Sequence, residues 1–167
     1  GEILKRMVLI KGGFGYLWGR IAEYLWKSGY SARIGTRKIE LESNVSNPHY
    51  DLVQLNLFNK KSLEAACKNI TIIIHLDAMN AQESVQEPEK AFQINVEGTS
   101  KLINAAVNEN VEKFIYFSTA HIYGSPLKGH LTENISPSPL HPYALTHYLA
   151  EEVIMKASKN QSINGIV

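Results

Sequence analysis

The sequence predicts an α/β fold in which a doubly wound parallel sheet is covered by helices on both faces. Short apolar runs alternate along the chain with segments whose apolar residues recur at helical spacing. A glycine-rich turn at residues 12–15 lies between the first apolar run and the first helical segment. Because strands separated by helices are joined by right-handed crossovers, we expect them to pair in parallel.

Each expected element has a local reason. Apolar runs predict strands over residues 6–10, 30–35, 49–57, 70–76 and 111–118. The isoleucine-rich run among them, at residues 70–76, is typical of a strand buried on both faces. Helical spacing predicts helices over residues 19–28, from residue 62, over residues 88–108 and over residues 143–159. Gly29 is expected as the C-cap of the first helix, and Ser62 as the N-cap of the second.

Composition narrows the class of protein. A chain of 167 residues with 44% apolar residues is predicted to form one domain with its own core. The formal charge of +1 gives no electrostatic case for a nucleic-acid or membrane partner. No apolar run approaches the ~20 residues that span a bilayer. The single cysteine, Cys67, excludes an intramolecular disulfide and fits a reducing compartment, so we expect a cytoplasmic protein. Cys67 itself is expected to be a buried helical residue.

The histidines do not predict a metal site. His121, His130, His141 and His147 match no compact zinc motif, so no metal is expected. His75 lies inside an apolar run and is expected to be a hydrogen-bonded core residue.

The glycine turn predicts a nucleotide site. In such a turn the first glycine permits the tight bend, the second lets the backbone approach a diphosphate, and the third lets the helix pack on the strand. Gly12 and Gly15 occupy the first two positions, so the positive end of the following helix would face the phosphates. The third position falls on Trp18. Either Gly19 makes the close contact instead, or the Trp18 ring crowds the diphosphate.

Five motifs follow one another in a characteristic order. They are K-G-G-F-G-Y-L-W at residues 11–18, I-H-L-D-A at 74–78, N-V-E-G-T at 95–99, F-S-T-A-H-I-Y-G at 117–124 and P-Y-A-L-T-H at 142–147. This order resembles the extended short-chain dehydrogenase/reductase family, in its NAD-dependent epimerase/dehydratase branch. The family patterns are T-G-G-x-G-F-I-G, H-L-A-A, N-V-x-G-T, F-S-S-x-x-V-Y-G and P-Y-x-x-S-K.

The resemblance covers residues 5–156 and implies a Rossmann-like NAD(P)-binding domain over residues 1–167. In the family, substrate choice lies mostly in a C-terminal lobe, which is expected to be absent from this chain. Either the chain is a fragment or the protein lacks that lobe.

The resemblance also implies the chemistry. It assigns proton transfer to Tyr143, with the Thr119 hydroxyl bonded to the reacting oxygen. A free phenol has a pKa of ~10, which the family lowers with a lysine four residues later on the same helix face. His147 takes the lysine's place here, and an imidazole with a pKa of ~6.5 is mostly neutral near pH 7. The alternatives are a Tyr143 that only packs on the sheet edge and a Thr119 that only caps a strand end.

Cofactor contacts are implied at fourteen positions. These are Gly12, Gly15, Tyr16, Leu17, Thr36, Arg37, Asn56, Leu57, Leu76, Asp77, Ala78, Asn95, Tyr143 and His147. No carboxylate follows the second strand before Glu40, and Arg37 could hold a 2′-phosphate, so NADP is slightly favoured over NAD unless Arg37 is only a solvated surface residue. Asp77 stands where the family has a small residue. Its carboxylate would repel phosphates unless it points away or meets a cation.

Three functions stay open at this point. The first is an NAD(P)-dependent epimerase, dehydratase or reductase acting on a nucleotide-activated sugar. The second is a catalytically weakened relative that binds a nucleotide and regulates or interacts. The third is a reductase of the same family acting on a non-sugar carbonyl. Relatives commonly form homodimers through two-helix contacts, so a homodimer is expected.

Overall fold

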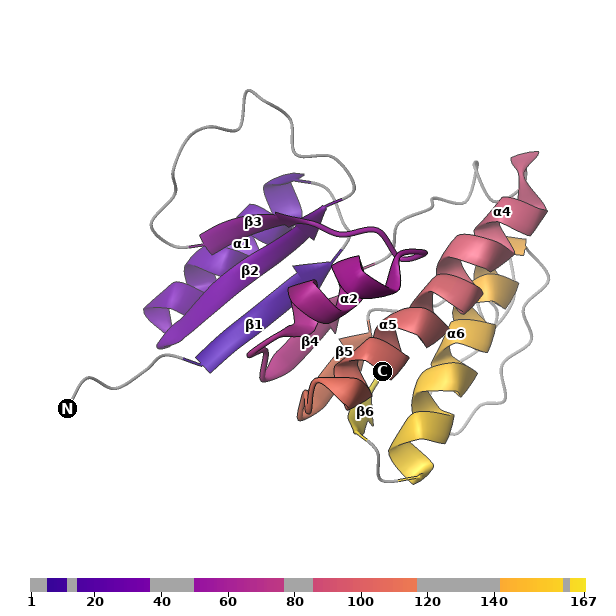
Figure 1. Ribbon diagram of the computed structural model, residues 1–167. Coiled ribbons are helices and arrows are strands. Elements are labelled where there is room, and N and C mark those ends of the chain that lie inside the picture. The colour runs from indigo at the N-terminus through magenta and orange to yellow at the C-terminus, as the bar shows by residue number, and fades with distance from the viewer. Residues whose placement is uncertain (1–5, 12–14, 37–49, 77–85, 117–141, 161–162) are drawn as a thin grey trace, which may run out of the picture.

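The structure is a computed structural model (Figure 1). It describes residues 6–11, 15–36, 50–76, 86–116, 142–160 and 163–167, with residues 15–18 and 142–148 described by their backbone only. Six parallel strands form one sheet in the order β3-β2-β1-β4-β5-β6. They are β1 (Arg6–Lys11), β2 (Tyr30–Thr36), β3 (Tyr50–Gln54), β4 (Ile72–His75), β5 (Lys113–Tyr116) and β6 (Asn164–Ile166). The predicted Rossmann-like α/β fold is therefore confirmed.

Helices connect the strands. They are α1 (Gly15–Lys27), α2 (Lys60–Cys67), α4 (Pro88–Phe92), the π-helical turn η2 (Gln93–Glu97), α5 (Gly98–Asn108) and α6 (Pro142–Lys159). The helix predicted over residues 88–108 is present, but its middle turn is π-helical. Strand β6 was not expected from the sequence.

Helices cover the two faces of the sheet (Figure 1), and a hydrophobic core lies on each face. On one face Val8 and Ile10 of β1 pack with Ala22 of α1. On the other face Leu9 packs in a larger core to which α2, α5 and α6 contribute. Alternate residues of β1 thus face opposite cores, as the two-residue period of a strand requires.

Strand β4 divides its residues in the same way. Ile73 and His75 are buried, whereas Ile72 and Ile74 are half-buried and pack against the α1-side core. Both faces of the strand are thus covered by a hydrophobic core, as expected, although Ile72 and Ile74 stay partly exposed on the α1 side.

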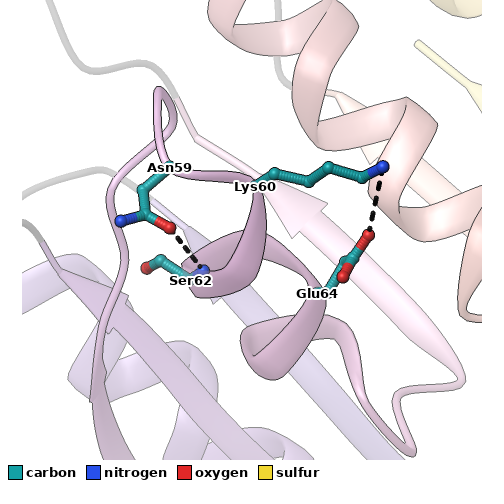
Figure 2. Close-up of polar contacts among 4 residues, drawn as sticks. All are labelled: Asn59, Lys60, Ser62 and Glu64. Carbon is teal, nitrogen blue, oxygen red and sulfur yellow. Dashed lines mark hydrogen bonds and ion pairs between the residues drawn. The ribbon is translucent and has the colours of Figure 1, made fainter.

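The start of α2 also corrects the sequence analysis (Figure 2). Its N-cap is Asn59, whose side chain accepts a hydrogen bond from the Ser62 N–H at 3.1 Å. The Ser62 hydroxyl instead accepts from the Asn56 N–H at 3.0 Å and donates to the Gln54 carbonyl at 3.3 Å. Ser62 therefore ties the end of β3 to α2 and does not cap the helix.

Two other expectations hold. Gly29 follows the end of α1 with a φ of 90°, a left-handed conformation that glycine adopts without strain. Cys67 is fully buried, and burial raises the pKa of its thiol to about 12. A thiol in that state is not nucleophilic near neutral pH, so Cys67 is a core residue.

Candidate functional site

The sheet changes winding direction between β1 and β4. From β1 the chain proceeds through α1 to β2 on one side, while β4 pairs with β1 on the other side. Open α/β sheets bind ligands at such a switch point, outside the carboxyl ends of the strands. Lys11 and His75 end the two strands there and are register partners, and the Leu76 N–H donates to the Lys11 carbonyl at 2.7 Å.

Four buried polar side chains gather beside this edge. Within the described ranges they are the complete set of buried polar or charged residues: Lys11, His75, Asn95 and Thr99. Two of them end β1 and β4, and the other two lie in η2 and at the start of α5. A core that is otherwise apolar thus becomes polar at the switch point.

Hydrogen bonds connect three members of this cluster. The Thr99 hydroxyl donates to the Asn95 carbonyl at 2.6 Å, and its oxygen lies 3.0 Å from His75 Nε2. Because the hydroxyl has a single hydrogen, the Nε2 atom of His75 must be the donor in the second bond. The His75 ring also lies against Phe114 and Tyr116, with ring centroids 5.9 Å and 5.3 Å away. The expectation of a hydrogen-bonded core histidine is confirmed.

Asn95 is held in the π-helical turn. It is 3% exposed, and η2 packs beside α6 as well as α5. Single π-turns within helices occur often at functional sites, because the extra residue re-aims side chains. The contact of Asn95 with a cofactor stays a prediction.

Leu57 and Gly98 form a close contact between the β3–α2 turn and α5. A Cβ atom on Gly98 would lie 2.7 Å from Leu57 Cδ1, so only glycine fits there without movement. Leu57 is 6% exposed and belongs to the larger core. A cofactor contact from Leu57 would therefore have to use its main chain.

Asn56 shapes the turn before α2. Its Oδ1 atom accepts a hydrogen bond from the Phe58 N–H at 3.0 Å, while the residue itself is exposed. The carbonyl end of the side chain thus holds the turn, and its amide end would be the donor to an adenine.

The structure places part of the predicted site. Gly15 begins α1, Thr36 ends β2 and Leu76 follows β4, all at the carboxyl edge of the sheet. Tyr143 and His147 lie one helical turn apart near the start of α6. The side chains of Tyr16, Leu17, Tyr143 and His147 are outside the described part, as are residues Gly12, Arg37, Asp77, Ala78 and Thr119.

One of the two alternatives at the glycine turn is wrong. Among the described residues, a Cβ atom on Gly19 would meet no heavy atom within 4 Å, so this glycine makes no close contact between the helix and the described strands. The helix begins at Gly15, which places Gly19 in its second turn. The Trp18 side chain is outside the described part.

Sequence reasoning missed two residues. Lys11 is a buried lysine at the end of an apolar strand, and a lysine in that sequence position was the signal that could have found it. Arg33 Nη1 donates to the carbonyls of Ala66 and Lys68 at 2.8 Å each and so caps the C-terminal end of α2. Arg33 holds the fold together, whereas Lys11 lies at the site.

Comparison with known proteins decides the family. The family model described as "NAD dependent epimerase/dehydratase family" matches residues 8–167. The chain belongs to this family. The extended short-chain dehydrogenase/reductase resemblance is thereby confirmed.

Similar members of the epimerase/dehydratase family include 4-epimerases. A putative UDP-glucose 4-epimerase of Methanocaldococcus jannaschii is 29% identical over 89% of this chain and 50% of its own length. The UDP-glucose 4-epimerase of Rhizobium meliloti is 25% identical over 96% of this chain and 49% of its own. The chain thus spans about half the length of the curated relatives that it matches.

Solved structures of the family share the fold. The UDP-Glc/GlcNAc 4-epimerase of Campylobacter jejuni is 25% identical, with a TM-score of 0.82 over 96% of this chain and 51% of that one. The UDP-glucose 4-epimerase of Brucella ovis in complex with NAD is 23% identical, with a TM-score of 0.83 over 96% of this chain and 50% of that one.

The described residues offer neither a membrane span nor a metal site. No helix among them is both long enough and apolar enough to cross a membrane. No group of three or more His, Cys, Asp or Glu side chains within the same ranges could hold a metal ion.

Proposed function

We propose that this chain is the dinucleotide-binding part of an NAD(P)-dependent epimerase, dehydratase or reductase that acts on a nucleotide-activated sugar. The observation that carries the proposal is the start of α1 at Gly15, at the carboxyl edge of the sheet beside the switch point between β1 and β4. The family match and its 4-epimerase relatives support the substrate class.

The residues at this edge fit a nicotinamide dinucleotide. The first N–H groups of a helix have no intrahelical acceptor, and the helix dipole is positive at that end, so α1 suits a diphosphate. Lys11 is the buried last residue of β1 and directly precedes the glycine turn. Gly12, Gly15, Tyr16 and Leu17 would hold the diphosphate.

The remaining cofactor contacts would come from neighbouring strand ends. Thr36 and Arg37 would meet the adenosine ribose, and Asn56 and Leu57 the adenine. Leu76, Asp77, Ala78 and Asn95 would lie along the nicotinamide half. NAD and NADP both remain candidates, because the NAD in solved relatives gives no support to the preference suggested by Arg37.

The catalytic residues would be Tyr143, Thr119 and His147. The bound nicotinamide would supply hydride chemistry at a sugar carbon. Tyr143 would take the proton from the sugar hydroxyl, while Thr119 donates a hydrogen bond to the same oxygen. His147, one turn after Tyr143 in α6, would bond the nicotinamide ribose but supply little positive charge at neutral pH.

Binding and turnover test the proposal separately. Calorimetry should show dinucleotide binding, and a coupled assay with UDP-glucose should show interconversion or oxidation of the sugar. Absence of NAD and NADP binding would remove the proposal. Binding without turnover of any nucleotide sugar would favour the second candidate, a catalytically weakened relative, for which His147 in place of the lysine is the specific observation.

We also propose a homodimer. A groove of about 780 Å³ runs between α2, α5 and α6, with an apolar floor that includes Leu63, Ile103 and Val153. Phe58 lines the groove and is 46% exposed. Phe58→Asp should weaken dimerisation in sedimentation equilibrium, whereas Tyr24→Asp, at an exposed aromatic residue of α1, should not. A monomeric wild type would contradict the proposal.

A further inference from the structure

Asn56 lies at the carboxyl edge of the sheet, just after β3 ends its pairing with β2. The Leu55 N–H donates to the Thr36 carbonyl at 2.8 Å, which holds the end of β3 beside the end of β2. Asn56 is the next residue along the chain, and it is exposed. A ligand that crosses the ends of β2 and β3 therefore passes within reach of this side chain.

Three hydrogen bonds fix the conformation of Asn56. Its N–H donates to the Ser62 hydroxyl at 3.0 Å, and its carbonyl accepts from the Asn59 N–H at 3.1 Å. Its side-chain Oδ1 atom accepts from the Phe58 N–H at 3.0 Å. Because a backbone N–H can only donate, the side-chain atom that faces it must be the amide oxygen and not the amide nitrogen. The fold thus determines which way the amide of Asn56 is turned.

The other end of the Asn56 side chain is a pure hydrogen-bond donor. Within the described ranges, no residue accepts a hydrogen bond from Asn56 Nδ2, and an amide nitrogen cannot itself accept one. An asparagine that reads adenine through two hydrogen bonds uses its oxygen and its nitrogen together. Here the oxygen is turned toward the Phe58 N–H. Asn56 therefore offers a base its two amide hydrogens.

The expected position of the base decides which atom this donor meets. The proposed function places the adenosine ribose at the end of β2 and the adenine at the end of β3, one strand spacing of about 4.8 Å away. The edge of adenine that lies farthest from its ribose carries N1, which accepts a hydrogen bond, and the 6-amino group, which donates. A donor at the end of β3 can bond to N1 but not to the amino group, since two donors repel each other.

We propose that Asn56 determines base specificity by donating a hydrogen bond from Nδ2 to the N1 atom of adenine, without reading the 6-amino group. The inference rests on the proposed function for the position of the base. The Phe58 N–H orients the amide for this contact, because it holds the oxygen in the turn. A purine without the 6-amino group is therefore bound as tightly as adenine, whereas a purine with a C–H group in place of N1 is bound more weakly.

Calorimetry with three nucleotides tests this assignment. They are ADP, purine riboside 5′-diphosphate, which lacks only the 6-amino group, and 1-deaza-ADP, which has a C–H group in place of N1. Relative to ADP, the wild type should bind 1-deaza-ADP about tenfold more weakly, because one hydrogen bond is lost, and purine riboside diphosphate within about twofold. Asn56→Asp should reverse this ranking. Its carboxylate still accepts from the Phe58 N–H but offers the base an acceptor, so removal of the amino group should now cost about tenfold in affinity.

Asn59→Asp is the matched control. It adds the same carboxylate three residues later in the same turn, and it keeps the cap of α2, because a carboxylate can accept from the Ser62 N–H as the amide oxygen does at 3.1 Å. It should rank the three nucleotides as the wild type does. If Asn56→Asp does not fold, as judged by circular dichroism, Asn56→Ala replaces it and should lose the difference between ADP and 1-deaza-ADP.

The outcomes separate this assignment from the proposed function. A wild type that needs the 6-amino group, an unchanged ranking in Asn56→Asp, or the same reversal in Asn59→Asp would overturn the role of Asn56 even where NAD binds. A wild type that ranks the three nucleotides as expected but binds neither NAD nor NADP would keep the base assignment and remove the proposed function. A wild type that binds none of these nucleotides would overturn both.

Discussion

His75 and Thr99 join the central sheet to the helix that follows it. His75 Nε2 lies 3.0 Å from Thr99 Oγ1, and Thr99 is completely buried at the start of α5. The Thr99 hydroxyl accepts a hydrogen bond from His75 Nε2 and donates one to the Asn95 carbonyl at 2.6 Å. Two residues 24 positions apart thus fix the π-helical turn, and with it Asn95, against the end of β4.

Replacing Thr99 tests this connection. Thr99→Val keeps the shape of the side chain but leaves the buried Nε2 hydrogen of His75 without its acceptor. We expect a loss of about 1–3 kcal/mol in the free energy of unfolding, measured by urea denaturation. Ser100→Ala, at the next and half-buried position, should change stability by much less. Equal effects of the two substitutions would show that the hydroxyl of Thr99 is not specially required.

A pair of glycine substitutions tests the packing of α5. Gly98→Ala should destabilise the protein by about 1–3 kcal/mol, because the new methyl would lie 2.7 Å from Leu57 Cδ1. Gly19→Ala, whose new methyl would have no atom of the described residues within 4 Å, should stabilise α1 by up to about 1 kcal/mol. Thermal unfolding of both variants measures the difference. Adding Leu57→Ala to Gly98→Ala should relieve the clash, and strictly additive effects would contradict this contact.

The Cys67 thiol predicts a dependence of stability on pH. Burial first, and the nearby Glu109 carboxylate second, raise its pKa from 9.0 to about 12, with Arg33 opposing them. Above pH 9 the unfolded chain loses this proton while the folded chain keeps it, so the thiol contributes stability below pH 9 and loses it as the pH rises toward 12. The stability advantage of the wild type over Cys67→Ala should therefore shrink between pH 8.5 and 11, as measured by urea denaturation. A constant difference across that ~2.5-unit range would contradict the shifted pKa.

The residue at position 147 controls the charge near Tyr143 in the proposed function. His147→Lys should increase dinucleotide affinity or turnover several-fold, because an ammonium stays charged near pH 7 whereas imidazole does not. His147→Gln is the neutral control and should give no increase. The measurements are the Kd for NAD and kcat with a nucleotide sugar. Identical values for the histidine and lysine proteins would mean that this position does not face the cofactor.

Local pattern was sufficient to predict the architecture. The alternation of apolar runs with helical segments is a property of neighbouring residues, and it predicted five of the six strands and their parallel pairing. The ordered motifs identified the family for the same reason, since each is a short contiguous segment. The boundaries were less accurate: α1 begins at Gly15 and not at residue 19, and the third strand ends at Gln54.

Contacts between distant segments determined the rest. Asn59 and Ser62 are both good capping residues, and the path of the chain leaving β3 decides that Asn59 caps α2 while Ser62 bonds to Gln54. The burial of Lys11 depends on β2 and β4 pairing on either side of β1. Propensity and periodicity act over a few residues, whereas burial and the environment of a charge depend on which segments the fold brings together. That is why the family could be recognised in the sequence while the burial of Lys11 could not.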